Sequence, residues 1–152
     1  MNYDLFIKEV HEQLVKVGWT ITERPDKRIE FAVTRDETTT IVTTKRGIAF
    51  LNGDRLSKDD IKEVLDSVHK ARKGAAMPPL FPVTNILVFV FEHANNTDWI
   101  CKNAKKRDLL ATNYTVSWVV DLTRMRLEKH AGLPMISSGE SEIEAVLSNS
   151  TG

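Results

Sequence analysis

The hydrophobic pattern is most distinctive at residues 84–91, where six consecutive apolar residues follow Thr84 and Asn85. An apolar run without alternation is typical of a strand that is covered on both faces of a sheet. The polar residues that follow, from Glu92 to Trp99, predict a turn and the start of a helix. We therefore expect a central strand at residues 85–91, with polar side chains at its carboxyl end.

Helices are predicted where apolar residues recur every three or four positions. In the first, Phe6, Val10, Leu14 and Val17 share one face, with Ile7 beside them, and Gly18 is a natural end. Capping-box patterns, in which a serine precedes an acidic residue by three positions, begin two others. The predicted helices are 3–17, Ser57 to Gly74, Asn96 or Thr97 to Leu110, and Ser141 to Leu147.

Strands are predicted where apolar and β-branched residues alternate with polar ones. Asp36 and Glu37 suggest one turn, and Gly47 permits another. The predicted strands are 19–23, 29–34, 38–44, 48–51, 85–91, 114–120 and 125–129. The order αβββ(β)αβαββα predicts an α/β fold with a mixed sheet: one domain over residues 1–147, followed by a polar tail or linker at 148–152.

Composition narrows the function classes. The chain has 152 residues, 41% hydrophobic and 28% charged, which is ordinary for a soluble domain. Its net charge of zero argues against a dedicated nucleic-acid binder, although a local patch stays compatible with it. The single Cys101 fits a reducing compartment, and no signal peptide or long apolar span is visible. These features predict a cytoplasmic location.

The element order is similar to that of the restriction-endonuclease-like fold, which has a helix, three strands, a helix and a further strand. Enzymes resembling this fold hold divalent cations with an acid on the second strand and an acid-x-Lys pattern on the third. Here Glu30 and Asp36 bracket the second strand and Lys45 follows the third, but Thr43 occupies the acidic position. We therefore expect the fold without its nuclease chemistry.

A second candidate site lies at the carboxyl end of the predicted central strand. Glu92, His93 and Asp98 carry groups that can bind a divalent cation, and strand ends of this kind often form sites. The alternative is that Asp98 only supports the start of a helix, while His93 lies on the surface. We favour this alternative, so the expected cofactor is none. The other histidines form no evident constellation in the sequence.

Two further features each have a structural and a functional explanation. Cys101 lies early in a predicted helix, where its pKa could be lowered, but a buried core thiol is the favoured interpretation. Lys102, Lys105 and Lys106 would share one face of that helix, near a second basic stretch at residues 70–73. Such residues can contact an anionic membrane surface or nucleic acid, but a solvated helix face is the favoured explanation.

The chain resembles the soluble N-terminal cytosolic domain of rhomboid intramembrane proteases of Bacillus and Clostridium type. The matching features are Gly18-Trp19, the basic stretch Lys70-Ala71-Arg72-Lys73, the apolar strand 85–91, and Asp98-Trp99. The resemblance implies a domain without catalytic residues, whose partner is the membrane-embedded remainder of the same protein. We therefore expect a non-catalytic cytosolic regulatory or interaction domain that contacts a protein partner or a membrane surface. A nuclease-like enzyme or inactive relative, and a divalent-cation sensor, are the alternatives.

Overall fold

A computed structural model describes residues 1–38, 43–73, 83–108, 113–129 and 139–149. These residues form one α/β domain with a mixed, seven-stranded sheet, which confirms the predicted fold class. The elements are α1 (Tyr3–Lys16), β1 (Thr20–Thr22), β2 (Ile29–Thr38), β3 (Thr43–Asn52), the 3₁₀ helix η1 (Gly53–Arg55), α2 (Lys58–Lys73), β4 (Val83–Phe91), α3 (Asp98–Asn103), β5 (Lys106–Arg107), β6 (Asn113–Asp121), β7 (Arg126–Glu128) and α4 (Glu140–Asn149).

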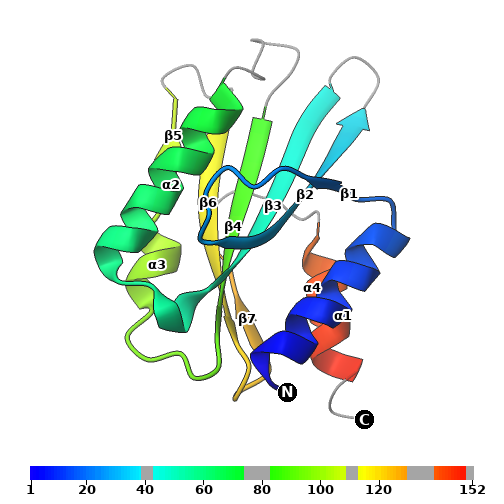
Figure 1. Cartoon of the computed structure of the whole chain (residues 1–152), viewed down its shortest axis with the longest axis vertical. Helices are drawn as coiled ribbons and strands as arrows, with labels where there is room; N and C mark the ends of the chain where they lie inside the picture. Colours follow the sequence, from blue (N-terminus) through cyan, green and yellow to red (C-terminus); the bar gives the residue numbers. More distant parts are fainter. Residues whose placement is uncertain (39–42, 74–82, 109–112, 130–138, 150–152) are drawn as a thin grey trace.

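The strands are ordered β1-β2-β3-β4-β6-β5, with β7 also paired to β6 (Figure 1). The first three strands form an antiparallel meander, whereas β3, β4 and β6 are parallel. Helices α2 and α3 are the crossover connections that parallel strands require. All nine residues of β4 are buried, and β4 pairs on both sides. The prediction of a central strand here is confirmed.

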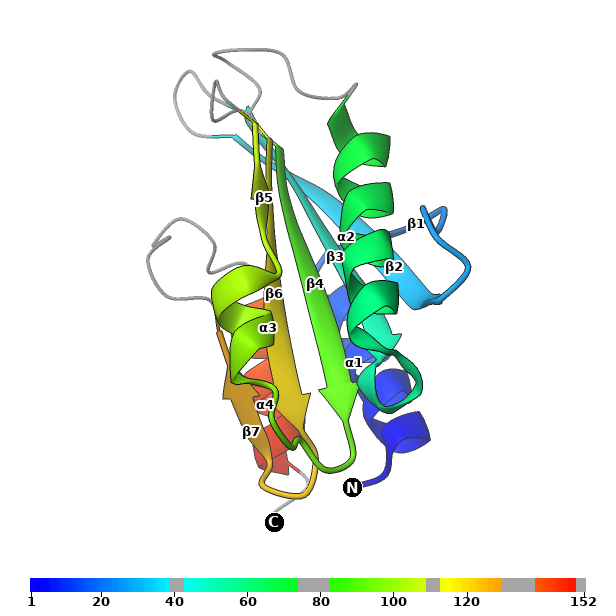
Figure 2. The same ribbon diagram turned by 90° about the vertical axis from the view of Figure 1, so that its left-hand side faces the viewer.

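The sheet lies between two helical layers (Figures 1 and 2). Helices α1 and α4 cover one face, and α2 and α3 cover the other. Because successive side chains of a strand point to opposite faces, β4 supplies both layers. Ile86, Val88 and Val90 pack toward α1 and α4, while Leu87 and Phe89 pack toward α2 and α3.

Helix α1 follows its sequence pattern closely. Asn2 caps its start, because Asn2 Oδ1 accepts a hydrogen bond from the Leu5 N–H at 2.9 Å. Phe6, Val10 and Leu14 are fully buried against the sheet. The placement of Val17 on this face is wrong, because the helix ends at Lys16 and Val17 is 38% exposed. Gly18 has a φ of 101°, the left-handed conformation that ends a helix at little cost when the residue is glycine. The predicted helix and its end are confirmed.

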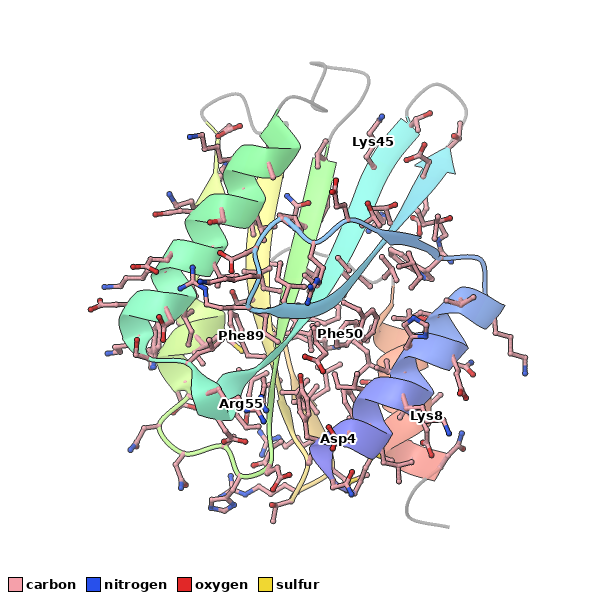
Figure 3. The ribbon with its side chains drawn as sticks, in the orientation of Figure 1. Asp4, Lys8, Lys45, Phe50, Arg55 and Phe89 are labelled. Atoms are coloured by element: carbon pink, nitrogen blue, oxygen red, sulfur yellow. The ribbon has the colours of Figure 1, made fainter. Side chains whose placement is uncertain are left out.

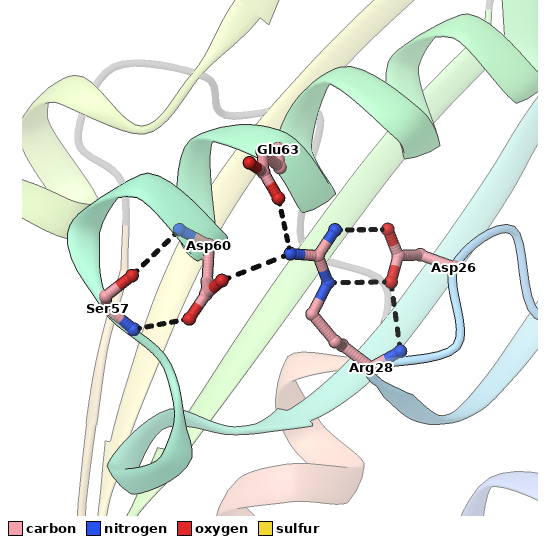
Figure 4. Close-up of polar contacts among 5 residues, drawn as sticks. All are labelled: Asp26, Arg28, Ser57, Asp60 and Glu63. Carbon is pink, nitrogen blue, oxygen red and sulfur yellow. Dashed lines mark hydrogen bonds and ion pairs between the residues drawn. The ribbon is translucent and has the colours of Figure 1, made fainter.

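The capping box at the start of α2 is also confirmed. Asp60 N–H donates to Ser57 Oγ at 3.1 Å, and Ser57 N–H donates to Asp60 Oδ2 at 2.9 Å (Figure 4). The second predicted box is wrong. Helix α4 begins at Glu140 after Gly139, whose φ is 90°, so Ser141 lies inside the first turn. Helix α4 runs to Asn149, two residues into the predicted tail, and residues 150–152 lie outside the described part.

An arginine clamps the β1–β2 connection onto α2. Arg28 donates to both carboxylate oxygens of Asp26 at 2.9 Å, and its Nη1 contacts Glu63 at 2.7 Å and Asp60 at 3.3 Å (Figure 4). Bidentate pairing of this kind fixes orientation as well as distance. The Arg28 guanidinium lowers the pKa of Asp26 to about 2, chiefly through side-chain hydrogen bonding. The clamp therefore holds the meander against the α2 layer.

The sequence misplaced the turns of the meander. The predicted turn at Asp36 and Glu37 is wrong, because β2 continues to Thr38. The predicted turn at Gly47 is also wrong, since Gly47 is paired in mid-strand with Thr34 and Asn85. Cross-strand pairing overrides the local turn preference of these residues. The predicted segment 48–51 lies within β3, together with residues 43 and 44 of the predicted segment 38–44; Thr38 ends β2, and residues 39–42 lie outside the described part.

The helix predicted from Asn96 or Thr97 to Leu110 is much shorter than expected. Helix α3 ends at Asn103, and residues 106–107 pair with β6 as β5. Lys102, Lys105 and Lys106 therefore do not share a helix face, and Lys106 forms an ion pair with Asp66. Tertiary pairing with β6 has overridden the helix propensity of this lysine-rich segment. Among the described residues, no helix is long and apolar enough to cross a membrane.

Candidate functional site

The three candidate cation ligands lie on the surface after β4. Glu92, His93 and Asp98 are all exposed. The Glu92 N–H donates to Asp54 Oδ2 at 2.9 Å, so its backbone is fixed while its side chain faces solvent. Nowhere in the described ranges do three or more His, Cys, Asp or Glu side chains form a group that can hold a metal ion. Asp98 lies in the first turn of α3, where a carboxylate is favoured by the helix dipole.

The described topology lacks the strand-order reversal that commonly places a ligand crevice at the carboxyl end of a parallel strand such as β4. In open α/β sheets, ligand crevices form where the strand order reverses and successive connections leave to opposite faces. Here the order β3-β4-β6 runs in one direction, and both connecting helices, α2 and α3, pack on the same face. The sequence could not show this, because it reveals the central strand but not the order of its neighbours.

The nuclease-like residues are not brought together either. Asp36 lies opposite Lys45 in the β2–β3 pair, but Glu30 is six residues from Asp36 along β2, about 20 Å for an extended strand. Thr43 lies opposite Thr38, with 3.0 Å between their Oγ1 atoms. Figure 3 shows Lys45 near the start of β3, far from Arg55 beyond its end. The three candidates therefore cannot bind one cation together.

A buried polar network that sequence reasoning missed lies near the other end of β4. His69 on α2 is only 8% exposed. Its Nδ1 lies 2.8 Å from Thr115 Oγ1 on β6, and its Nε2 lies 2.9 Å from Asp108 Oδ1. Buried polar groups are costly unless they are paired, so these contacts account for an imidazole between a helix and a sheet.

Two amide side chains complete this network. Asn85 Nδ2 donates to Asn113 Oδ1 at 3.2 Å and to Thr115 Oγ1 at 3.1 Å. Asn113 Nδ2 in turn donates to the carbonyl oxygen of His69 at 3.1 Å. We call these five residues, His69, Asn85, Asp108, Asn113 and Thr115, the His69 network. It links α2, β4 and β6 and so fixes their register.

Both ring nitrogens of His69 have a hydrogen-bond partner. Asp108 offers a carboxylate acceptor to Nε2. Thr115 Oγ1, which accepts from Asn85 Nδ2, lies next to Nδ1.

The carboxylate–imidazole–hydroxyl series has the elements of a nucleophilic triad, but its geometry does not permit that role. A nucleophile must touch its substrate, and Thr115 is 0% exposed. The hydroxyl is also covered by the paired Asn85 side chain, which is 2% exposed. The His69 network is therefore a structural device that orients α2 on the sheet.

The one thiol is also unsuited to nucleophilic chemistry. Cys101 is 9% exposed, and burial raises its pKa to about 11, so the reactive thiolate is disfavoured at neutral pH. Its Sγ lies 3.5 Å from the carbonyl oxygen of Glu128 and packs in the α2–α3 layer. The prediction of a buried core cysteine is confirmed.

The remaining candidate is a surface. Among the described residues, the exposed large apolar side chains all lie between positions 5 and 21: Leu5 at 43%, Val15 at 45%, Val17 at 38% and Ile21 at 47%. Leu5 and Val15 lie on the outer side of α1, Val17 follows its end, and Ile21 is on the edge strand β1. We call these four residues the α1 surface.

Charged residues are interspersed in the α1 surface. Lys8 and Glu12 are exposed on α1 between Leu5 and Val15 (Figure 3 labels Lys8). Exposed apolar residues can mark a protein-contact surface when several occur in one region, whereas single ones need no explanation. This surface was not predicted from the sequence, because the pattern placed Val17 on the buried face of the helix and Ile21 in a strand.

Comparisons with known proteins add no assignment: no family model matches the chain, and no curated protein or solved structure matches it significantly.

Proposed function

We propose that this chain is a non-catalytic regulatory or interaction domain that acts by contacting another protein through the α1 surface. The observation that carries the proposal is the concentration of the exposed large apolar side chains of the described residues within positions 5–21. Exposing apolar area to water costs about 25 cal/mol per Å². A partner that covered these side chains would remove them from water, and this burial would favour binding.

The interior supports a scaffold role. At the end of the β2–β3 pair where Glu30 lies, β3 presents Phe50 and Leu51, which are 0% exposed. Phe50 stacks on Phe31 with 4.6 Å between ring centroids, so this part of the sheet serves packing. Of the candidate groups named from the sequence, Glu30, Glu92, His93 and Asp98 are exposed, and Cys101 is buried.

We propose the regulatory part of a rhomboid-type membrane protease as the biological setting. The support is the resemblance at Gly18-Trp19 and Asp98-Trp99, together with the position of the first and last helices. The start of α1 and the end of α4 lie at the same end of the molecule, so a following segment would leave at the end where α1 starts (Figures 1 and 2). Sequencing the gene beyond codon 152 tests this setting, and a stop codon there would contradict it.

The interaction itself can be tested by site-specific photocrosslinking in the native host. A photoreactive benzoylphenylalanine at position 5 or 15 should give a discrete crosslinked product, and the same probe at Asp59, an exposed position on α2, should not. Equal crosslinking from all three positions, or none from positions 5 and 15, would contradict the proposed surface.

The absence of catalysis requires a separate assay. The purified chain should leave single- and double-stranded DNA and RNA intact in magnesium or manganese. Cleavage that disappeared in Lys45→Ala would overturn the non-catalytic proposal in favour of a nuclease.

A further inference from the structure

We propose that the partner of the α1 surface is a second copy of this chain, docked by an antiparallel, two-fold pairing of α1 with α1. This inference rests on the proposed interaction function and names its partner. The spacing and the charges of the residues in α1 support this partner.

The outward face of α1 has the spacing of a helix-pairing seam. Leu5, Lys8, Glu12 and Val15 are separated by three, four and three residues, which places them on one stripe of the helix. All four are exposed. The buried stripe of Phe6, Val10 and Leu14 lies on the opposite side, packed into the core. The outer stripe therefore faces away from the rest of the domain and is free to receive a second helix.

The stripe is complementary to itself when read in reverse. Leu5 and Val15 are each five residues from position 10, and Lys8 and Glu12 are each two residues from it. An antiparallel pair centred on that position puts Leu5 against Val15 of the other copy and Lys8 against its Glu12. Two-fold interfaces require this self-complementarity, because each contact occurs twice.

The charge pattern favours this partner over an unrelated protein. A two-fold pairing forms two Lys8–Glu12 contacts between the copies, whereas a parallel pairing would place like residues together. Apolar contacts of Leu5 with Val15 would border the charged pairs at both ends. Val17 and Ile21 extend the apolar area beyond Val15, where the start of the partner helix would lie.

The interface is small, so the dimer is expected to be reversible. Helix α1 has 14 residues and is about 21 Å long. A single helix pair of this length buries less than the roughly 1,200 Å² that characterises stable complexes. Association should therefore appear at micromolar or higher concentrations and should weaken with salt, since exposed charges are screened.

Charge reversal provides a decisive experiment by analytical ultracentrifugation of the whole chain. Lys8→Glu alone, or Glu12→Lys alone, replaces two attractive contacts by two repulsive ones and should weaken self-association by about tenfold or more. An equimolar mixture of the two variants should associate as the parent does. In the mixed pair, positions 8 and 12 of one chain are both acidic and those of the other chain are both basic, so both contacts are attractive again. The double variant Lys8→Glu/Glu12→Lys should also associate like the parent.

The equimolar mixture distinguishes a lost contact between chains from a defect in folding. Each chain in the mixture carries the same substitution as when it is alone, so recovery of association can come only from the contact between chains. Circular dichroism should show the parent's helix content in all variants. A parent chain that remains monomeric at millimolar concentration, or a mixture that associates no better than its components, would overturn the dimer.

The crosslinking experiment separates this failure from failure of the proposed function. A product from position 5 or 15 with twice the mass of the chain supports both proposals. A product that contains a different protein, with a monomeric parent chain, leaves the interaction function standing and removes the dimer. If neither position gives a crosslinked product, both the interaction function and the dimer are contradicted.

Discussion

The two ends of β4 have opposite characters. After its carboxyl end, Glu92, His93 and Asp98 are exposed and do not form a cation-binding group. Near its amino end, Asn85 is 2% exposed and belongs to the His69 network, which also joins α2 and β6. The first cluster is conspicuous in the sequence and the second is not. Polar residues gathered in a turn are therefore weaker indicators of organised structure than a polar residue at the margin of an apolar strand.

The physical reason is the difference in the cost of leaving a polar group unpaired. A side chain in the turn is satisfied by water and needs no protein partner. A buried amide or imidazole loses roughly 1–3 kcal/mol if it remains unpaired, so its surroundings must supply partners. The Nδ2 of Asn85 accordingly donates to Asn113 and Thr115, although its Oδ1 has no hydrogen-bond partner among the described residues. The exposed His93 needs no protein partner.

The largest expected effect concerns the apolar middle that separates the two ends. Phe89 is 0% exposed and packs in the α2–α3 layer, so Phe89→Ala loses transfer free energy and leaves a cavity. The free energy of unfolding should fall by about 3–5 kcal/mol in urea titrations. Leu5→Ala, at an exposed position, should change it by less than about 0.5 kcal/mol in a dilute, monomeric sample. Equal losses in the two variants would show that β4 is not the core strand.

Two separate histidine variants, His69→Ala and His93→Ala, compare the two ends of β4 directly. His69→Ala removes the partner of Asp108 and Thr115 and leaves a void, so it should destabilise the domain by about 2–4 kcal/mol. His93→Ala removes an exposed side chain and should cost less than about 0.5 kcal/mol. Thermal or urea unfolding of both variants gives the comparison. A His93 variant as unstable as the His69 variant would contradict the contrast between the ends.

The sequence predicted most elements because their signals are local. The central strand, α1 and the start of α2 follow from an apolar run, a helical stripe and a capping box. The turns at Glu37 and Gly47 and the end of α3 were misplaced, since strand pairing rather than local residue preference decides them. The His69 network depends on contacts between residues up to 46 positions apart, so no local pattern reveals it.

The Arg28 clamp on α2 should make stability depend on pH. Pro25, beside Asp26, lines a small hollow with Val68 and Asn85. Arg28 lowers the pKa of Asp26 to about 2, against about 3.9 for an unfolded chain. The unfolded state therefore takes up the proton first as the pH falls. This contribution to stability is present above about pH 4 and is lost as the pH approaches 2.

Urea titrations between about pH 5 and pH 2.5 measure the size of this effect. The Asp26 side chain is 8% exposed and that of Arg28 is 24% exposed, so partial screening limits the contribution to about 2 kcal/mol at most. Asp26→Asn should lower stability at about pH 5 and flatten its dependence on pH between about 4 and 2.5. A variant that keeps the parent's full pH dependence would show that Asp26 does not carry it.

The smallest expected effect sharpens the contrast at the exposed end. Asp98 lies in the first turn of the six-residue helix α3, and Thr97 makes no side-chain capping hydrogen bond there. A carboxylate at this position contributes about 0.3–1 kcal/mol through the helix dipole. Asp98→Asn should therefore lower stability by a few tenths of a kcal/mol, with or without manganese or zinc.

If Glu92, His93 and Asp98 instead bind a cation, metal at a hundredfold excess over its dissociation constant should stabilise the parent by about 2.7 kcal/mol. The Asn variant should then lose that gain. A saturable, metal-dependent rise in the melting temperature that Asp98→Asn abolishes would make this end of β4 a cation sensor.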